Sequence, residues 1–168
     1  ATCGYDWLLI DGEHAPNDLR STLAALQAVN AYPAHPVVRV VEGSQALIKQ
    51  MLDIGAKTLL VPMVDTASQA RAIAAATRYP PQGVRGMAGM SRAAKYGTQA
   101  DYLTTANRQM SVIVQLETEA ALAELEAIAQ VDGVDALFIG PADLSGSMGL
   151  PGQITHPRVM KADRKSVV

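Results

Sequence analysis

Five short apolar runs recur along the chain, and each run ends at a polar residue, a proline or a glycine. Apolar positions at helical spacing separate the runs. The runs predict strands near residues 7–11, 37–41, 58–62, 111–116 and 135–139. Continuous apolar runs are typical of parallel strands that are buried on both faces. The alternation of strands and helices therefore predicts an α/β fold built on a parallel sheet.

The helices between these strands follow from a repeat of about 3.6 residues in the apolar positions. We expect helices over residues 16–29, 44–54 and 67–77, a short helix that opens with a capping box at Thr98 and Asp101, and a helix whose N-cap is Thr118. Residues 79–97 form a long loop rich in Gly, Pro, Arg and Met. Loops of this length in compact domains are usually functional.

Residues at the strand ends distinguish two parallel α/β architectures. A doubly wound sheet concentrates its functional groups at one switch point, whereas a barrel carries them at the C-terminal ends of many strands. Side chains capable of chemistry follow four of the five runs, namely Asp11, Arg39, Glu117 and Asp143. This distribution favours the barrel and indicates an enzyme.

Composition excludes several other classes of protein. The chain has 168 residues of which 49% are apolar, enough for one domain with a core. Its net charge of -2 comes from well-mixed residues, which argues against a nucleic-acid partner. No apolar run is long enough to span a membrane, and the single Cys3 agrees with a reducing compartment. We expect a cytoplasmic protein.

Both ends of the chain are unusual. It starts at Ala1 and enters a strand almost at once, and residues 161–168 show neither helical nor strand periodicity. Residues 163–168 resemble a translated sequencing adaptor. We expect residues 1–160 to be a partial barrel domain and residues 161–168 to be a non-native tail.

Two carboxylates follow neighbouring runs directly. Glu117 and Asp143 are each explained singly by a helix start or a capped turn. At adjacent strand ends, however, they can share a hard divalent cation, and we favour that interpretation. The turn at Gly140 and Ala142 offers backbone N–H groups that can receive a carboxylate, although such a turn is also ordinary.

The first strand ends in a motif that places acids beside an imidazole. His14 could act as a general base with one of the two acids of the motif holding its tautomer, but for a lone histidine a capped loop before a helix is the more usual explanation. Asp53 ends a helix, where the dipole disfavours its charge. It is either solvent-exposed, the simpler explanation, or a partner of His14.

Arg39 ends the second apolar run and needs an anionic partner there. It could bind a substrate carboxylate or a developing oxyanion, or it could form a structural ion pair. Lysine, which a Schiff-base mechanism would require, ends none of the predicted strands.

Six segments of the chain, in order and at consistent spacing, closely resemble the HpcH/HpaI aldolase family, and the resemblance covers about residues 4–159. The motifs are Asp6–Pro16, Pro36–Arg39, Leu59–Val64, Arg78–Gly86, Val114–Thr118 and Phe138–Ser145. Within the family they are most like the members that act on 4-hydroxy-2-oxo-heptane-1,7-dioate. The resemblance implies a (β/α)₈ TIM barrel, of which about five of the eight strands are present here.

The resemblance also implies an activity, a class II aldolase that cleaves 4-hydroxy-2-oxo acids to pyruvate and an aldehyde, in aromatic compound catabolism. Glu117 and Asp143 would bind Mg²⁺, Mn²⁺ or Co²⁺, and Arg39 would stabilise the enolate oxygen. The implied roles of the other residues are substrate contacts from Gln115, Gly140 and Ala142, proton transfer by His14 with Asp11 and Asp53, and a contact from Arg92 to a neighbouring subunit's site.

The family's members are expected to be homo-oligomers, often hexamers. Two alternatives remain beside the aldolase. One is a related lyase acting on acyl-CoA thioesters, which would need a basic nucleotide groove. The other is a catalytically inactive barrel fragment, because missing strands would expose apolar edges of the sheet.

Overall fold

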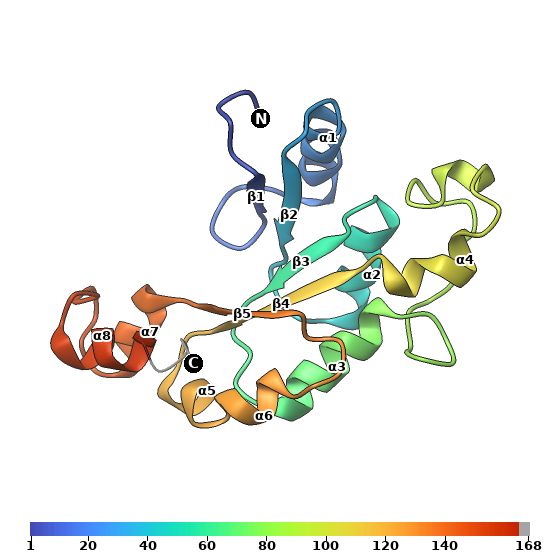
Figure 1. The fold of residues 1–168 in the computed structure, drawn as a ribbon. Coiled ribbons are helices and arrows are strands. Elements are labelled where there is room, and N and C mark those ends of the chain that lie inside the picture. Colours follow the sequence, from blue (N-terminus) through green and yellow to red (C-terminus); the bar gives the residue numbers. More distant parts are fainter. Residues whose placement is uncertain (165–168) are drawn as a thin grey trace.

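In the computed structural model, which describes residues 1–164, five parallel strands form one sheet in the order of the chain (Figure 1). The strands are β1 (Trp7–Asp11), β2 (His35–Arg39), β3 (Thr58–Val61), β4 (Ser111–Leu116) and β5 (Ala136–Ile139). A doubly wound sheet would reverse its strand order at a switch point, and this order runs in one direction throughout. The arrangement is that of a TIM barrel in which five strands are present, and it confirms the predicted fold class.

The longer helices begin where a side chain caps them. They are α1 (Leu19–Val29), α2 (Gln45–Asp53) and α3 (Ala67–Thr77), and shorter ones are α4 (Tyr102–Thr105), α5 (Glu119–Ala123), α6 (Leu125–Ala129) and α7 (Pro141–Ser147). Asp18 accepts hydrogen bonds from the N–H groups of Arg20 and Ser21. Because Asp18 is the N-cap, α1 begins at Leu19 and not at the predicted residue 16.

Two further differences from the sequence analysis concern short segments. The expected capping box is absent, because Asp101 makes no capping hydrogen bond and the Thr98 hydroxyl donates to the carbonyl of Lys95. Residues 161–164, for which the sequence showed no helical period, form the end of α8 (Pro157–Arg164). The remainder of the predicted tail, residues 165–168, lies outside the described residues.

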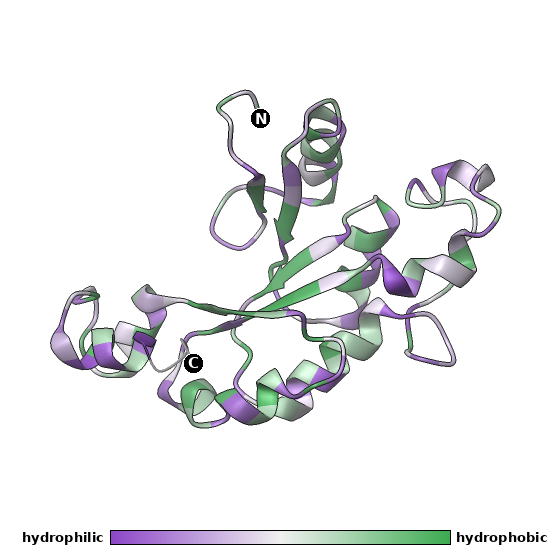
Figure 2. Cartoon of the chain, in the orientation of Figure 1, coloured by the Kyte–Doolittle hydropathy of each residue, from purple (hydrophilic) through white to green (hydrophobic). Residues whose placement is uncertain are grey.

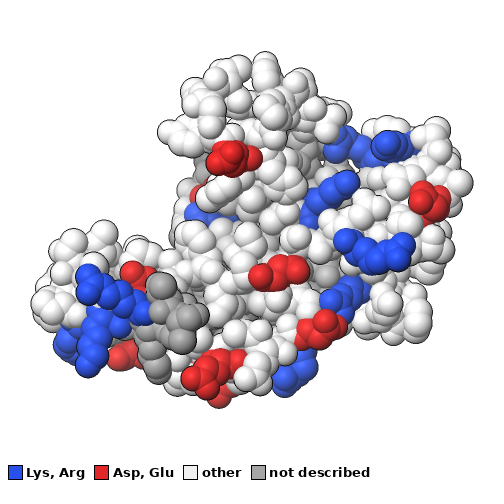
Figure 3. All heavy atoms as spheres, viewed as in Figure 1, with Lys and Arg blue, Asp and Glu red and all other residues white. Residues whose placement is uncertain are grey.

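One main core lies between the sheet and the helices that cover its outer face. It joins outward-facing strand residues to Leu26 of α1, Leu52 of α2, Ile73 of α3 and Ile128 of α6. Figure 2 shows this apolar band running through the centre of the molecule. Charged side chains of both signs are interspersed over the face seen in Figure 3. Among residues 1–164, no helix has the length and apolarity needed to cross a membrane.

The opposite, inner face of the sheet is also apolar. Trp7, Leu9 and Phe138 are 54%, 41% and 43% exposed there, and together with Val37, Leu60 and Ile113 they line an apolar hollow. In a closed barrel such residues pack in layers against side chains from the other strands. In this five-stranded sheet the corresponding face is partly exposed.

A second, smaller core anchors the long loop that follows α3. Arg85, from this loop, has a fully buried side chain whose guanidinium lies 4.4 Å from the ring centre of Tyr79. Its Nη2 donates to Asp53 Oδ1 at 2.8 Å and to the hydroxyl of Tyr102 at 3.2 Å. Asp53 is therefore the counter-ion that ties the loop to the end of α2.

We predict that Asp53→Ala lowers the free energy of unfolding by about 3–5 kcal/mol, because it leaves the buried Arg85 charge without its partner. Urea denaturation followed by circular dichroism measures the change. Asp132→Ala is the matched control, since Asp132 pairs with Arg78 at a site where its own side chain is 90% exposed. The control should change stability little, and equal effects of the two substitutions would contradict the assignment.

Candidate active site

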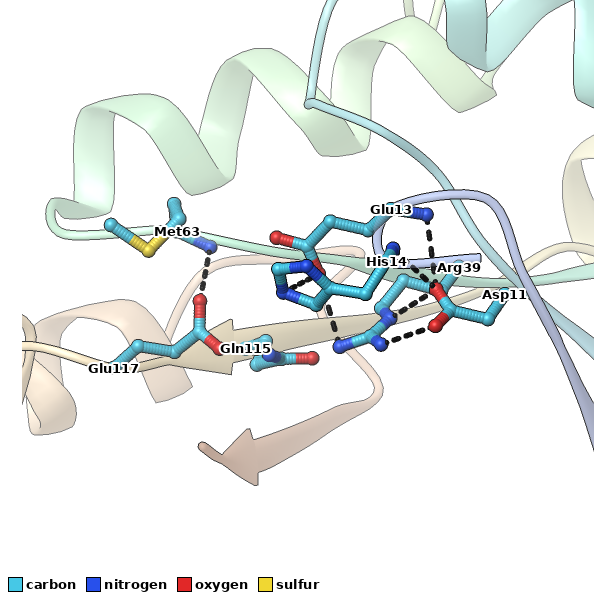
Figure 4. Close-up of polar contacts among 7 residues, drawn as sticks. All are labelled: Asp11, Glu13, His14, Arg39, Met63, Gln115 and Glu117. Carbon is cyan, nitrogen blue, oxygen red and sulfur yellow. Dashed lines mark hydrogen bonds and ion pairs between the residues drawn. The ribbon is translucent and has the colours of Figure 1, made fainter. Parts of the chain in front are cut away.

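The C-terminal ends of three strands bring one arginine and several acids together (Figure 4). Asp11 ends β1, Arg39 ends β2, and these two residues lie opposite each other in the register of the sheet. Glu117 follows β4 directly. Since all strands of a parallel sheet end at the same edge, residues far apart in the sequence converge there.

Arg39 binds two carboxylates at once. Its Nε donates to Asp11 Oδ1 at 2.8 Å and its Nη2 donates to Asp11 Oδ2 at 2.7 Å, which is a bidentate pair. Its Nη1 lies 3.0 Å from Glu13 Oε2, an ion pair without hydrogen-bond geometry. The hydrogen bonds from Arg39 lower the pKa of Asp11 to about 2. The structural ion pair that the sequence left open is thus present, and the guanidinium keeps unused N–H donors.

Glu13 is a member of this site that the sequence analysis did not single out. Its side chain is 14% exposed, and burial raises its pKa although the Arg39 charge opposes the rise. The imidazole Nε2 of His14 lies 3.6 Å from Glu13 Oε2, while the imidazole itself is largely exposed. Two acids of the same motif, separated by one residue, were the available signal, but only geometry shows which of them reaches the imidazole.

Glu117 is held in a closely built environment. It is 2% exposed, accepts a hydrogen bond from the N–H of Met63 at 3.2 Å, and accepts another from the side-chain amide of Gln115. Met63 has a φ of 55°, a left-handed conformation that costs energy for a residue with a side chain. The end of β3, which had no predicted role, thus contributes this N–H group.

Gly140 allows the Glu117 carboxylate to lie against the end of β5. A Cβ atom at position 140 would lie 2.4 Å from Glu117 Oε1. The N–H of Gly140 donates to the carbonyl of Leu116 at 3.1 Å, which fixes the two strand ends side by side. Asp143 and Ala142 follow in the first turn of α7, and both are exposed. The predicted pair of carboxylates therefore comes from adjacent strand ends.

The donor set fits a hard divalent cation. Two acids, Asp11 and Glu13, contact the Arg39 guanidinium, Glu117 lies buried against Gln115, and the side-chain oxygen of Gln115 is buried without a hydrogen-bond partner. Excess negative charge and a free oxygen are what such an ion would satisfy. Residues 1–164 contain no cluster of three or more potential His, Cys, Asp or Glu ligands. Glu117 and Asp143 alone would leave coordination positions for other molecules.

Two predicted site residues lie elsewhere in the chain. Asp53 is at the end of α2, and its carboxylate bonds to Arg85 and not to His14, which corrects the predicted pairing. Arg92 donates from Nη1 to the carbonyl of Ile54 at 2.6 Å, beside the same helix end. Helices of a barrel return the chain to the N-terminal edge of the strands, so α2 carries both contacts away from the candidate site.

Comparison with known proteins identifies the family. The model of the HpcH/HpaI aldolase/citrate lyase family matches residues 1–168. The chain belongs to this family. It is 61% identical over 163 residues to hydroxypyruvate/pyruvate aldolase of Cupriavidus necator and 55% identical over 168 residues to 2-keto-3-deoxy-L-rhamnonate aldolase of Klebsiella pneumoniae. These matches cover 96% and 99% of the chain but 61% and 63% of the two enzymes.

A solved structure of a family member from Burkholderia cenocepacia superimposes with a TM-score of 0.96 at 48% identity. It matches 98% of this chain and 66% of its own. The chain thus spans about three fifths to two thirds of the relatives described here. Neither curated relative bears the name of the seven-carbon diacid aldolase that the motifs suggested.

The Asp11–Arg39 pair predicts a pH dependence of stability. Because the folded-state pKa of about 2 lies below the ordinary value of 3.8, ionised Asp11 stabilises the fold. This contribution is complete above pH 3.8 and is lost as the pH falls through about 2. The stability difference between wild type and Asp11→Asn should accordingly shrink over that interval, as measured by urea unfolding. A carboxyl carbon NMR titration of Asp11 with a midpoint near 4 would contradict the pairing.

Proposed function

We propose that the C-terminal strand ends of this chain form the active site of a class II pyruvate aldolase, which cleaves 4-hydroxy-2-oxo acids to pyruvate and an aldehyde. The observation that carries the proposal is the group at the strand ends: Arg39 between Asp11 and Glu13, with the buried Glu117 beside them. The names of the two curated relatives, both aldolases of 2-oxo acids, support it.

In the proposed reaction, a base removes the proton of the substrate's C4 hydroxyl, and the C3–C4 bond then breaks. The aldehyde leaves, the electron pair of the broken bond forms the enolate of pyruvate, and a proton added at C3 completes the product. His14 is the base that we assign, because its exposed imidazole stands at the mouth. Glu13, 3.6 Å from this imidazole, is the acid that positions it.

Negative charge develops on the keto oxygen during cleavage. The N–H groups of Arg39 that Asp11 leaves free can donate to this oxygen, and the bidentate pair fixes the direction of the guanidinium beforehand. Glu117 and Asp143 would hold a divalent metal such as Mg²⁺, Mn²⁺ or Co²⁺, which supplies Lewis-acid stabilisation of the same charge. We assign substrate contacts to Gln115 near the end of β4 and to the backbone of Gly140 and Ala142 at the start of α7.

The remaining expectations from the resemblance stay predictions. They are a homo-oligomer, often a hexamer, a cytoplasmic location, and a contact from Arg92 to a neighbouring subunit's site. The identity of the aldehyde belongs with them.

The metal assignment predicts that Glu117→Gln and Asp143→Asn each lower pyruvate-forming activity by about 100-fold or more and weaken Mn²⁺ binding in parallel. The assay couples pyruvate to lactate dehydrogenase, with and without chelator, on the product of the open reading frame that encodes the chain. Glu119→Gln, an exposed acid at the start of α5, is the matched control. Activity that survives chelation but is trapped by borohydride would overturn the class II mechanism.

The role of Arg39 is tested separately from the metal. Arg39→Ala should lower kcat by roughly 10²–10³-fold, because it removes donors directed at the developing oxyanion. Calorimetric titration should show that Mn²⁺ still binds this variant. Arg71→Ala, on the outer helix α3, controls for loss of positive charge. An unchanged kcat in Arg39→Ala would contradict the oxyanion role.

A further inference from the structure

The loop that follows β3 runs beside the end of β4 and is bonded to it. The N–H of Met63 donates to Glu117 Oε2 at 3.2 Å (Figure 4). The N–H of the next residue, Val64, donates to the carbonyl of Gln115 at 3.1 Å. The left-handed conformation of Met63 persists only where the surrounding structure holds it. The contacts that fix this loop therefore also fix the N–H group that the Glu117 carboxylate receives.

One side-chain hydrogen bond joins the same loop to the residue after Glu117. Asp65 Oδ1 accepts from the hydroxyl of Thr118 at 2.5 Å, and both side chains are partly buried. Hydrogen bonds to a carboxylate are shorter and stronger than those between neutral groups. Along the chain, Glu117 is therefore flanked by two contacts to one loop, at Gln115 and at Thr118.

Asp65 and Thr118 are each anchored to the start of a helix. The backbone N–H of Asp65 donates to the side-chain oxygen of Gln69, in the first turn of α3, at 2.8 Å. The hydroxyl oxygen of Thr118 accepts from the N–H of Ala121 at 2.9 Å and thereby caps α5. The bond between them thus links two helix starts across the ends of two neighbouring strands, which makes it a rigid support.

The start of α5 is also tied to the helix that carries the second assigned metal ligand. The N–H of Glu119 donates to Ser147 Oγ at 2.9 Å. Ser147 is the last residue of α7, and Asp143 lies in the first turn of that helix. Thr118 therefore lies between Glu117 and a contact that reaches the helix of Asp143.

We propose that Asp65 is a positioning residue for the Glu117 carboxylate and that it acts through the hydroxyl of Thr118. The inference rests on the proposed function, because it takes Glu117 as a metal ligand. A glutamate side chain has several rotatable bonds, and fixing the backbone beside it reduces the number of directions in which its carboxylate can point. An amide oxygen at position 65 can accept the same hydrogen bond, whereas an alanine cannot.

Amide hydrogen exchange of the metal-free chain, followed by NMR, tests the positioning directly. Asp65→Ala should raise the exchange rate of the Met63 N–H by about tenfold or more, since this group donates to a carboxylate that is no longer held in place. The N–H of Val40, which donates to the carbonyl of Leu60 at 3.1 Å, is the internal reference for global stability. Asp65→Asn should restore most of the protection. An unchanged Met63 rate in Asp65→Ala would overturn the proposal.

Mn²⁺ binding, measured by electron paramagnetic resonance, tests the consequence for the metal site. Asp65→Ala should weaken the affinity by about tenfold or more, a typical effect of residues that orient a metal ligand. Asp65→Asn should bind Mn²⁺ nearly as tightly as the wild type. Thr118→Val removes the other partner, and combining it with Asp65→Ala should weaken binding no further than the more severe single variant. Additive losses would contradict an action through this hydrogen bond.

Asp18→Ala is the matched control, because it removes an exposed acid that caps α1. It should lower the stability of the chain but leave the Mn²⁺ affinity and the relative Met63 exchange rate unchanged. Equal losses in Asp18→Ala and Asp65→Ala would mean that destabilisation or lost charge explains both, and would overturn the proposal. A wild-type chain that binds no Mn²⁺ would refute the proposed function, whereas Met63 exchange in the metal-free chain would still decide the role of Asp65.

Discussion

The parallel register of β1 and β2 is the constraint on which the candidate site depends. It places Asp11 opposite Arg39, so that one guanidinium can bind the carboxylate in a bidentate pair at the last residue of each strand. A slip of one residue would move either side chain to the other face of the sheet. The apolar positions before these residues make such a slip costly, because they would lose their burial against the helices.

The same edge of the sheet carries more negative charge than its arginine can balance. Burial raises the pKa of Glu13, and the charge of Arg39 offsets this rise only in part. Uncompensated charge of this kind is typical of functional sites, where a ligand supplies the opposite charge. The strained Met63 and the close contact at Gly140 serve the same carboxylate, so three strand ends together fix one side chain.

Patterns along the chain were sufficient for the strands and for the residues that end them, because buried parallel strands leave a strong apolar signal. The same patterns predicted less well the features that depend on a local helix cap or on a partner far away in the sequence. Asp18 caps α1 and sets its first residue later than the apolar pattern predicts. The counter-ion of Asp53 is Arg85, which lies 32 residues later in a loop without periodicity. Glu13 could not be separated from Asp11 as the neighbour of His14, since that choice depends on side-chain geometry at a strand end.

An ion pair at the opposite edge of the sheet anchors the long loop. Each helix returns the chain from the acidic C-terminal edge to the N-terminal edge, where α2 ends at the Asp53–Arg85 pair. The long loop can approach that helix end because Arg85 and Arg92 neutralise its carboxylate and its terminal carbonyl.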